Sequence, residues 1–327
     1  MDAATPASGE IHHPTLVRSA PVGGARYRHL LEAARRFPPI RTAVVHPCDA
    51  VSLVSALEAM EAGLIVPVLV GPLAKIHKAA TEAGRDLKSV QIIDVPHSHA
   101  AAERAVALGR EAKVDALMKG ALHTDELMAA VVDRAGGLRS ERRMSHVFAL
   151  DVAHYSKPLF ITDAAVNIAP NLDTKRDIVQ NAIDLLHALG IKSPKVAILS
   201  AVDTVSSKIP STIDAAALCK MAEREQIVGG ILDGPLAFDN AISSEAAHTK
   251  GISSPVAGQV DILLVPDLEA GNMLVKQLIY LAGAEAAGIV LGARIPIMLT
   301  SRADSDAARL ASCALAQLLV HHRLNAP

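Results

Sequence analysis

Short apolar runs alternate with segments of helical periodicity along most of the chain. Residues 51–62, 100–111, 174–189 and 214–224 show helical spacing, with Gly or Pro at the joints between segments. Strand, helix and strand in this succession predict parallel βαβ units. The runs typical of buried strands are residues 42–46, 66–70, 90–94, 115–119, 159–163, 196–201, 230–233, 262–266 and 295–300.

The last apolar run leads into Thr300, Ser301 and Arg302 and then into a helical pattern. In open α/β sheets, ligands bind beyond the carboxyl ends of strands, against helix N-termini that favour anions. A hydroxyl beside a guanidinium at such a junction predicts a site for an anion or an oxyanion. An ordinary alternative stays open: Ser301 and Asp304 also fit a capping box, with Arg302 paired to Asp304.

Four other predicted strands also end in polar residues, and together with Thr300 these residues predict a small-molecule site. Each residue has an ordinary interpretation as a turn, a cap or a solvated side chain. Five polar clusters at strand ends nevertheless favour a binding site whose ligand is an anion. The residues that we assign to substrate binding are Lys119, Gly120, His123, Thr124, Asp163, Asn167, Asp233, Asp267, Asn272 and Thr300.

Length and composition define the class of protein. The 327 residues suggest two domains at roughly 150 residues each, and a polar stretch at 134–146 predicts a junction after it. Aromatic residues make up 2% of the chain, and small aliphatic residues suit sheets covered on both faces. The net charge of -2 gives no case for nucleic acid. Three separated cysteines and no long apolar run predict a cytoplasmic protein without a membrane span.

Several common motifs are absent from the sequence. It contains no G-x-x-x-x-G-K-[ST] and no G-x-G-x-x-G after the first predicted strand, which disfavours the usual nucleotide sites. It also lacks H-E-x-x-H, C-x-x-C and G-x-S-x-G, so neither a metal site nor an acyl-serine hydrolase is predicted.

Taken together, the polar segments resemble the phosphate acetyltransferase/phosphate butyryltransferase family from about residue 40 onward. The residues that matter most are Asp267, Glu269 and Asn272 in one segment, and Ser301 and Arg302 in another. Within the family, the sequences of these segments look closest to the butyryltransferase branch. The segments that carry the resemblance are residues 119–124, 161–167, 199–203, 209–212, 230–239, 265–272 and 300–305.

The resemblance implies two three-layer α/β domains with a cleft between them, like isocitrate and isopropylmalate dehydrogenases. Residues 1–149 plus 291–327 would form the first domain and 150–290 an inserted second domain. It also implies a homodimer. The implied reaction is reversible transfer of a short acyl group, acetyl or butyryl, between coenzyme A and inorganic phosphate, which yields acyl phosphate. It proceeds by direct attack in a ternary complex, without a metal or a tightly bound cofactor.

By the same resemblance, Arg302 neutralises phosphate and Ser301 donates to the carbonyl oxygen or the phosphate. The sequence departs from the acetyltransferase branch at two points. Ala308 stands where that branch has a catalytic Asp, so Asp304 becomes the candidate base. Leu127 lies in the region where that branch has an Arg. Other residues are therefore expected to bind phosphate: Lys119, His123 or the basic run of Arg139, Arg142 and Arg143.

Two alternatives remain from the sequence alone. One is an NAD- and metal-dependent decarboxylating dehydrogenase of the same architecture. The other is a non-catalytic relative that senses acyl-CoA or acyl phosphate, an interpretation suggested by Ala308.

Overall fold

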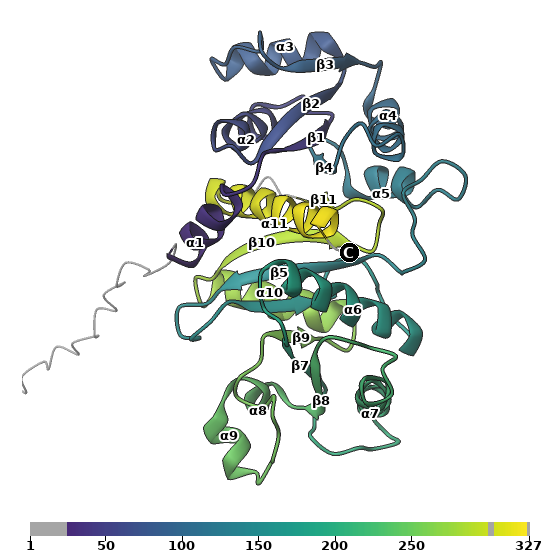
Figure 1. Cartoon of the computed structure of the whole chain (residues 1–327), viewed down its shortest axis with the longest axis vertical. Helices are drawn as coiled ribbons and strands as arrows, with labels where there is room; N and C mark the ends of the chain where they lie inside the picture. The colour runs from purple at the N-terminus through teal and green to yellow at the C-terminus, as the bar shows by residue number, and fades with distance from the viewer. Residues whose placement is uncertain (1–24, 300–303, 326–327) are drawn as a thin grey trace, which may run out of the picture.

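The computed structural model describes residues 25–299 and 304–325, and within them one sheet of eleven strands runs through the molecule. The strand order is β3-β2-β1-β4-β11-β10-β5-β6-β9-β7-β8, from top to bottom in Figure 1. The strands are β1 Ile40–Val45, β2 Ile65–Gly71, β3 Gln91–Asp94, β4 Ala116–Lys119, β5 Ser145–Asp151, β6 Leu159–Thr162, β7 Lys195–Leu199, β8 Ile231–Leu236, β9 Ile262–Leu264, β10 Glu285–Leu291 and β11 Ile297–Met298.

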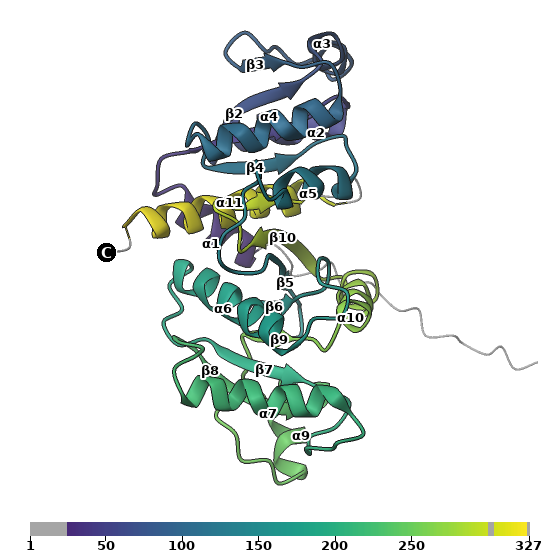
Figure 2. The ribbon, with the colours of Figure 1, turned by 90° about the vertical axis from the view of Figure 1, so that its right-hand side faces the viewer.

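Helices cover both faces of this sheet, as Figures 1 and 2 show for α2 and α4 beside β1 and β2. The buried faces of α2, α3, α6, α7 and α11 meet in one apolar cluster. Those of α4 and α5 form a second cluster, and α8 and α10 contribute to a third. The helices are α1 Ala25–Ala34, α2 Ala50–Glu61, α3 Leu73–Glu82, α4 Ser98–Arg110, α5 Thr124–Val132, α6 Leu172–Ala188, α7 Pro210–Glu223, α8 Phe238–Ile242, α9 Ser244–Thr249, α10 Leu268–Tyr280 and α11 Asp306–Asn325.

The parallel βαβ units expected from the sequence are confirmed in both halves of the sheet. β1 pairs in parallel with β2 and β4, and β11 also pairs in parallel with β4. In the other half, β9 pairs in parallel with β6 and β7, and β7 with β8. The fold is therefore a mixed α/β fold built on one large sheet.

The sequence pattern did not predict β5 and β10, which lie at the centre of the sheet. They pair antiparallel from Glu285 opposite Asp151 to Leu291 opposite Ser145. The predicted domain boundaries, 149/150 and 290/291, fall within these two strands. The backbone ladder is therefore continuous where the sequence suggested a junction, and the division into two domains stays a prediction.

The C-terminal segment returns to the first half of the sheet. β11 lies between β4 and β10, and α11 packs against α1 and α2. Gln317, fully buried in α11, donates from Nε2 to the carbonyl oxygens of Phe37 at 3.1 Å and Pro38 at 2.9 Å. These bonds attach α11 to the loop that enters β1. Among the described helices, none combines the length and the apolar character that a bilayer crossing requires.

A buried histidine, His146, lies near one end of the antiparallel pair, opposite Val290. The His146 ring packs against Phe148, with ring centroids 4.2 Å apart, and lies directly over Gly288 of β10. A Cβ at Gly288 would be 2.7 Å from Nε2 of His146, so the ring occupies space that only glycine leaves. Burial lowers the pKa of His146 to about 3, so the ring is neutral in the folded protein.

This burial predicts a loss of stability in acid. Below pH about 6.5 the unfolded chain protonates His146 while the folded chain does not, so the free energy of unfolding falls as the pH falls toward 3. The slope attributable to this residue is about 1.4 kcal/mol per pH unit. We expect urea unfolding between pH 6 and pH 4 to be less pH-dependent in His146→Phe than in the wild type by about that slope. Equal slopes in the two proteins would contradict the prediction.

Candidate functional site

The turn after β4 is held tightly against the end of β1. Lys119 ends β4, and the N–H of Gly120 donates to the carbonyl oxygen of Val45 at 2.9 Å. The N–H of Ala121 donates to the carbonyl oxygen of His46 at 2.9 Å. A Cβ on Gly120 would lie 2.4 Å from the Val45 oxygen, so this turn requires glycine. The predicted residues Lys119 and Gly120 are thus fixed at the end of the strand.

His46 contacts the turn that carries predicted site residues, and the sequence reasoning did not single it out. Its backbone has φ 55°, in the left-handed region, and its ring Nδ1 lies 3.0 Å from the carbonyl oxygen of Ala121. The side chain therefore links the end of β1 to the turn after β4. The signal in the sequence was a polar His46 followed by Pro47 at the end of an apolar run.

His123 and Thr124 open α5, and both are exposed. His123 is the N-cap residue, and its side chain makes no capping hydrogen bond, so the first N–H groups of the helix face outward. Asp125 and Glu126 lie in the same turn and reduce the attraction of this helix end for anions. Lys119 is therefore the stronger candidate for contact with a negatively charged ligand.

The end of β11 lies beside β4, because Met298 pairs with Met118, the residue before Lys119. The predicted residues Thr300, Ser301 and Arg302 follow this strand and lie outside the described residues. α11 begins only at Asp306.

The cap of α11 is Ser305, whose Oγ accepts from the N–H of Ala308 at 3.1 Å. The interpretation of Ser301 and Asp304 as the cap of this helix was therefore wrong, because the helix starts four residues later than that reading placed it. Ala308 itself is buried in α11, 5% exposed.

Asp304, the candidate base, is half-buried just before α11. Its carbonyl oxygen accepts from the Arg309 guanidinium at 2.5 Å. Burial raises the pKa of Tyr27, and the charges of Glu285, Asp151 and Asp304 raise it further. Asp304 therefore lies within electrostatic range of α1, and its catalytic role stays a prediction.

A second group of predicted residues surrounds the turn after β6. The Asp163 carboxylate accepts from the N–H groups of Ala165, Val166 and Asn167 at 3.0 to 3.1 Å, and from Nδ2 of Asn167 at 2.6 Å. Asp163 is 2% exposed, and burial raises its pKa against the opposing effect of these hydrogen bonds. The carboxylate shapes its own turn, so any role of Asp163 toward a substrate would pass through the backbone that it orients.

The start of α10 packs directly on this turn. Asp267 is the N-cap residue, with Oδ1 accepting from the N–H of Ala270 at 2.9 Å. Asn272 donates from Nδ2 to the carbonyl oxygen of Ala164 at 3.3 Å. A Cβ on Gly271 would be 2.9 Å from the Cβ of Ala164, so glycine permits the close approach. The structure thus brings Asp163, Asn167, Asp267 and Asn272 together.

Asp233 lies apart from both groups. It is inside β8, opposite Ala197, rather than beyond the strand as the sequence pattern suggested, because β8 continues to Leu236. Its Oδ1 accepts from the N–H of Gly234 at 2.9 Å. β7 and β9 separate β8 from β6, so the turn after β6 is two strands away.

The turns after β4 and β6 both contribute to one apolar cluster, although the two strands run in opposite directions. Three antiparallel pairings separate β4 from β6 in the sheet order. A twist of about 20–25° at each of the four steps turns β6 by roughly a right angle relative to β4. Leu122 after β4, Leu299 after β11 and Val166 after β6 pack in one apolar cluster. Residues next to both groups of predicted residues therefore belong to the same apolar cluster.

Comparisons with known proteins identify the family of this chain. A model of the family described as "Phosphate acetyl/butaryl transferase" matches residues 97–317. A phosphate acetyltransferase from Rhizobium meliloti is 63% identical over 303 residues, which cover 93% of this chain and 96% of that protein. A phosphate butyryltransferase from Clostridium acetobutylicum is 40% identical over 283 residues, covering 86% of this chain and 94% of that protein.

A solved structure has the same fold. The crystal structure of a branched-chain phosphotransacylase from Enterococcus faecalis is 28% identical and has a TM-score of 0.76. The match covers 86% of this chain and 99% of that chain. The family resemblance stated from the polar segments is thereby confirmed over most of the sequence. This chain belongs to the phosphate acetyl/butaryl transferase family and is an acyltransferase.

Proposed function

We propose that this protein transfers a short acyl group reversibly between coenzyme A and inorganic phosphate, with acetyl as its preferred group. Membership of the family over most of the chain is the observation that carries the proposal. The amino-acid sequence of the polar segments suggested butyryl. However, this chain is 63% identical to a relative named for acetyl transfer and 40% identical to one named for butyryl transfer. Acetyl is therefore the first substrate to test.

The proposed chemistry is direct attack in a ternary complex. A phosphate oxygen attacks the thioester carbonyl carbon, the C–S bond breaks, and CoA leaves as a thiolate that takes up a proton. In the reverse direction the CoA sulfur attacks the acyl phosphate after losing its proton to a base. We assign phosphate neutralisation to Arg302, donation to the developing oxyanion to Ser301, and proton transfer to Asp304. CoA and phosphate act as substrates, with no tightly bound cofactor.

The proposed binding surface includes the turn after β4, with Lys119, and the turn after β6, with the start of α10. The apolar cluster that includes Leu122, Leu299 and Val166 supports this proposal, because it receives side chains from both turns. The finer layout belongs to the same proposal: two α/β domains, 1–149 plus 291–327 and 150–290, with a cleft between them as in isocitrate and isopropylmalate dehydrogenases.

We also place the protein in the cytoplasm. Cys48, Cys219 and Cys313 are all free thiols, which suits a reducing compartment.

A homodimer is part of the proposal, and an exposed apolar surface supports it. Met273 and Tyr280 lie seven residues apart on one face of α10, 61% and 74% exposed. Leu281 at the end of the helix is 84% exposed, and Ile168 beside its start is 74% exposed. Large apolar side chains gathered on one surface are typical of protein interfaces. We therefore assign this face of α10 to the contact between subunits.

The reaction itself is tested with purified protein, acetyl-CoA or butyryl-CoA, phosphate and a thiol reagent that reports free CoA. We expect CoA release that depends on phosphate and is faster with acetyl-CoA. Tight binding of acyl-CoA without turnover would support the sensor interpretation instead. Activity that requires NAD and magnesium and ignores phosphate would support the dehydrogenase.

Substitution of Arg302 tests the assigned mechanism. Because the guanidinium would balance charge in the transition state, we expect Arg302→Ala to lower kcat/KM by about 10²- to 10³-fold, equivalent to roughly 3–4 kcal/mol. Arg28→Ala, at an exposed position on α1, is the control and should keep wild-type kinetics. Wild-type kinetics in Arg302→Ala would remove this residue from the mechanism.

Substitutions on α10 test the dimer. Charged residues at Met273 and Tyr280 would have to lose water inside the interface, so Met273→Glu/Tyr280→Glu should shift the mass in light scattering from dimer to monomer. Leu324→Glu, at a position 71% exposed on α11, should leave the mass unchanged. A monomeric wild-type protein, or a dimeric double variant, would refute the assignment.

A further inference from the structure

The loop before β5 lies at the same edge of the sheet as the turn after β6. β5 and β6 are antiparallel, with Val147 opposite Thr162, so the start of β5 is beside the end of β6. Nδ2 of Asn167, in the turn, donates to the carbonyl oxygen of Met144 at 2.8 Å. Arg143 therefore directly precedes a residue that is bonded to one of the predicted substrate-binding residues.

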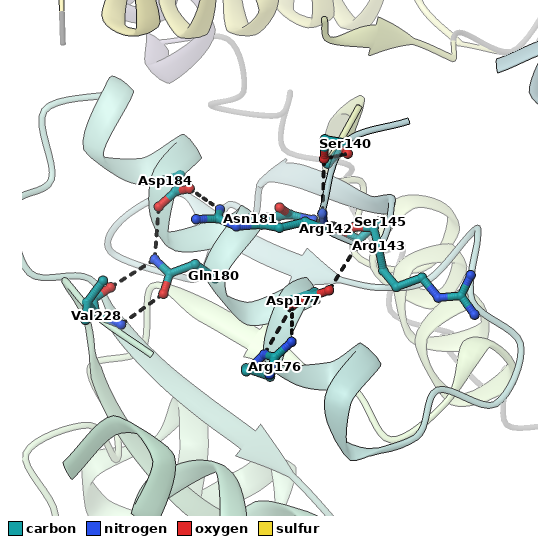
Figure 3. A network of polar contacts seen from close by, with 11 residues as sticks. Ser140, Arg142, Arg143, Ser145, Arg176, Asp177, Gln180, Asn181, Asp184 and Val228 are labelled. Atoms are coloured by element: carbon teal, nitrogen blue, oxygen red, sulfur yellow. Dashed lines mark hydrogen bonds and ion pairs between the residues drawn. The ribbon is translucent and has the colours of Figure 1, made fainter. Parts of the chain in front are cut away.

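The backbone of Arg143 is fixed on both sides by side chains of α6 (Figure 3). Its N–H donates to Oδ2 of Asp177 at 3.0 Å, and its carbonyl oxygen accepts from Nδ2 of Asn181 at 2.9 Å. Gly292, with φ 80°, passes so close that a Cβ there would lie 2.3 Å from the Arg143 oxygen. This exposed arginine thus projects from a backbone that three separate contacts hold in place.

The two consecutive arginines of this loop point in opposite directions. In Figure 3 the guanidinium of Arg142 extends to Asp184, with which it forms an ion pair. The side chain of Arg143 extends away from this network. Within residues 25–299 and 304–325, the structure shows no ion pair or hydrogen bond for its guanidinium. Arg142 is therefore neutralised by its neighbour, whereas Arg143 presents its full charge to solvent beside the turn after β6.

The predicted site needs such a charge. Both substrates in the proposed reaction are rich in phosphate, yet Lys119 is the only lysine or arginine among the predicted site residues that the structure describes. Asp163, Asp267 and Asp304 in the same set are acidic residues. Leu127, on the first turns of α5, is fully buried in an apolar cluster, so a cation at that position would have no access to the ligand.

We infer that Arg143 binds a phosphate group of the substrates, and that Asp177 and Asn181 are positioning residues that hold its backbone. The inference rests on the proposed acyl transfer and adds a residue to it. A planar guanidinium binds phosphate through two parallel N–H donors, which requires a defined orientation. The contacts from α6 supply that orientation. The phosphate group belongs either to inorganic phosphate or to CoA, and kinetics distinguish these sources.

The test compares Arg143→Gln with the matched control Arg134→Gln, at another exposed arginine outside the predicted site. Loss of a charge-assisted hydrogen bond should raise one KM in Arg143→Gln by about tenfold to a hundredfold, with kcat changed less. A rise for phosphate alone identifies inorganic phosphate as the ligand. A rise for acetyl-CoA that disappears with acetyl-dephospho-CoA identifies the 3′-phosphate, and a rise for both thioesters identifies the pyrophosphate. Arg134→Gln should leave both KM values within about twofold of the wild type.

The positioning role has its own readout. Asn181→Ala should raise the same KM as Arg143→Gln, and the double variant should show no further rise, because the two changes remove one interaction. Asp184→Asn, which touches Arg142 instead, should not raise it. Arg143→Lys keeps the positive charge but lacks the two parallel N–H donors of a guanidinium, so its KM should lie between those of Arg143→Gln and the wild type. A merely structural role for Asn181 would lower the unfolding midpoint and leave that KM unchanged.

Two outcomes are distinguishable. If the wild type releases CoA in a phosphate-dependent reaction and Arg143→Gln keeps every KM within about twofold, the inference about Arg143 is refuted while the proposed function stands. If the wild type shows no such reaction, the proposed function fails first. Circular dichroism and urea unfolding of each variant exclude misfolding as the cause of a kinetic change.

Discussion

The antiparallel pairing of β5 with β10 is the interaction on which the rest of the structure depends. In the described sheet, the strands from β3 to β11 pair in parallel, and so do those from β6 to β8. The β5–β10 pair is the longest of three successive antiparallel pairings that join these two parallel parts. Together these pairings reverse the strand direction between β4 and β6, and the accumulated twist turns β6 by roughly a right angle relative to β4. The turns that carry the predicted site residues are thereby brought to one apolar cluster, although they are distant in sequence.

Around this pair, small residues allow the close approaches that shape the site. Gly288 leaves space for the His146 ring, Gly271 lets α10 pack on the turn after β6, and Gly120 fits against the carbonyl oxygen of Val45. Carboxylates such as Asp163 are used to order the backbone rather than to face a ligand. The residues left to contact anionic substrates are therefore cations and backbone N–H groups at the ends of strands. This division of roles fits an enzyme whose substrates carry many negative charges.

The sequence predicted the elements whose signal is local. The apolar runs of β1, β2 and β4 are bounded by polar or breaker residues, and Lys119, Asp267 and Asn272 fall where a strand-end pattern places them. β5 and β10 were missed because their features depend on each other. In β5, the polar residues Ser145 and His146 precede a short apolar run, Val147 to Leu150. In β10, the stretch Ala286, Ala287 and Gly288 has little strand propensity. The pairing explains both features, because the His146 ring of β5 fills the space next to Gly288 of β10.

Other residues could not be found because their partners are distant. In the sequence, nothing distinguishes Arg143 from other arginines. Only the structure shows that Asp177 and Asn181, on a helix more than thirty residues later, hold its backbone. The helix cap is Ser305 and not the predicted Ser301, because α11 begins later than the periodicity indicated. Thr300, Ser301 and Arg302 lie outside the described residues, so their assignment still depends on the sequence.

The continuous ladder also constrains how the molecule can move. A hinge between two bodies normally lies in a loop, where a few residues absorb the change in backbone angles. Here the connection between the halves is a ladder of seven residue pairs, and rotating one half against the other bends or twists hydrogen-bonded strands. The stiffness of the central ladder therefore spreads any closing motion over several strands. Larger displacements are left to the connecting segments at the strand ends, where the substrates would bind.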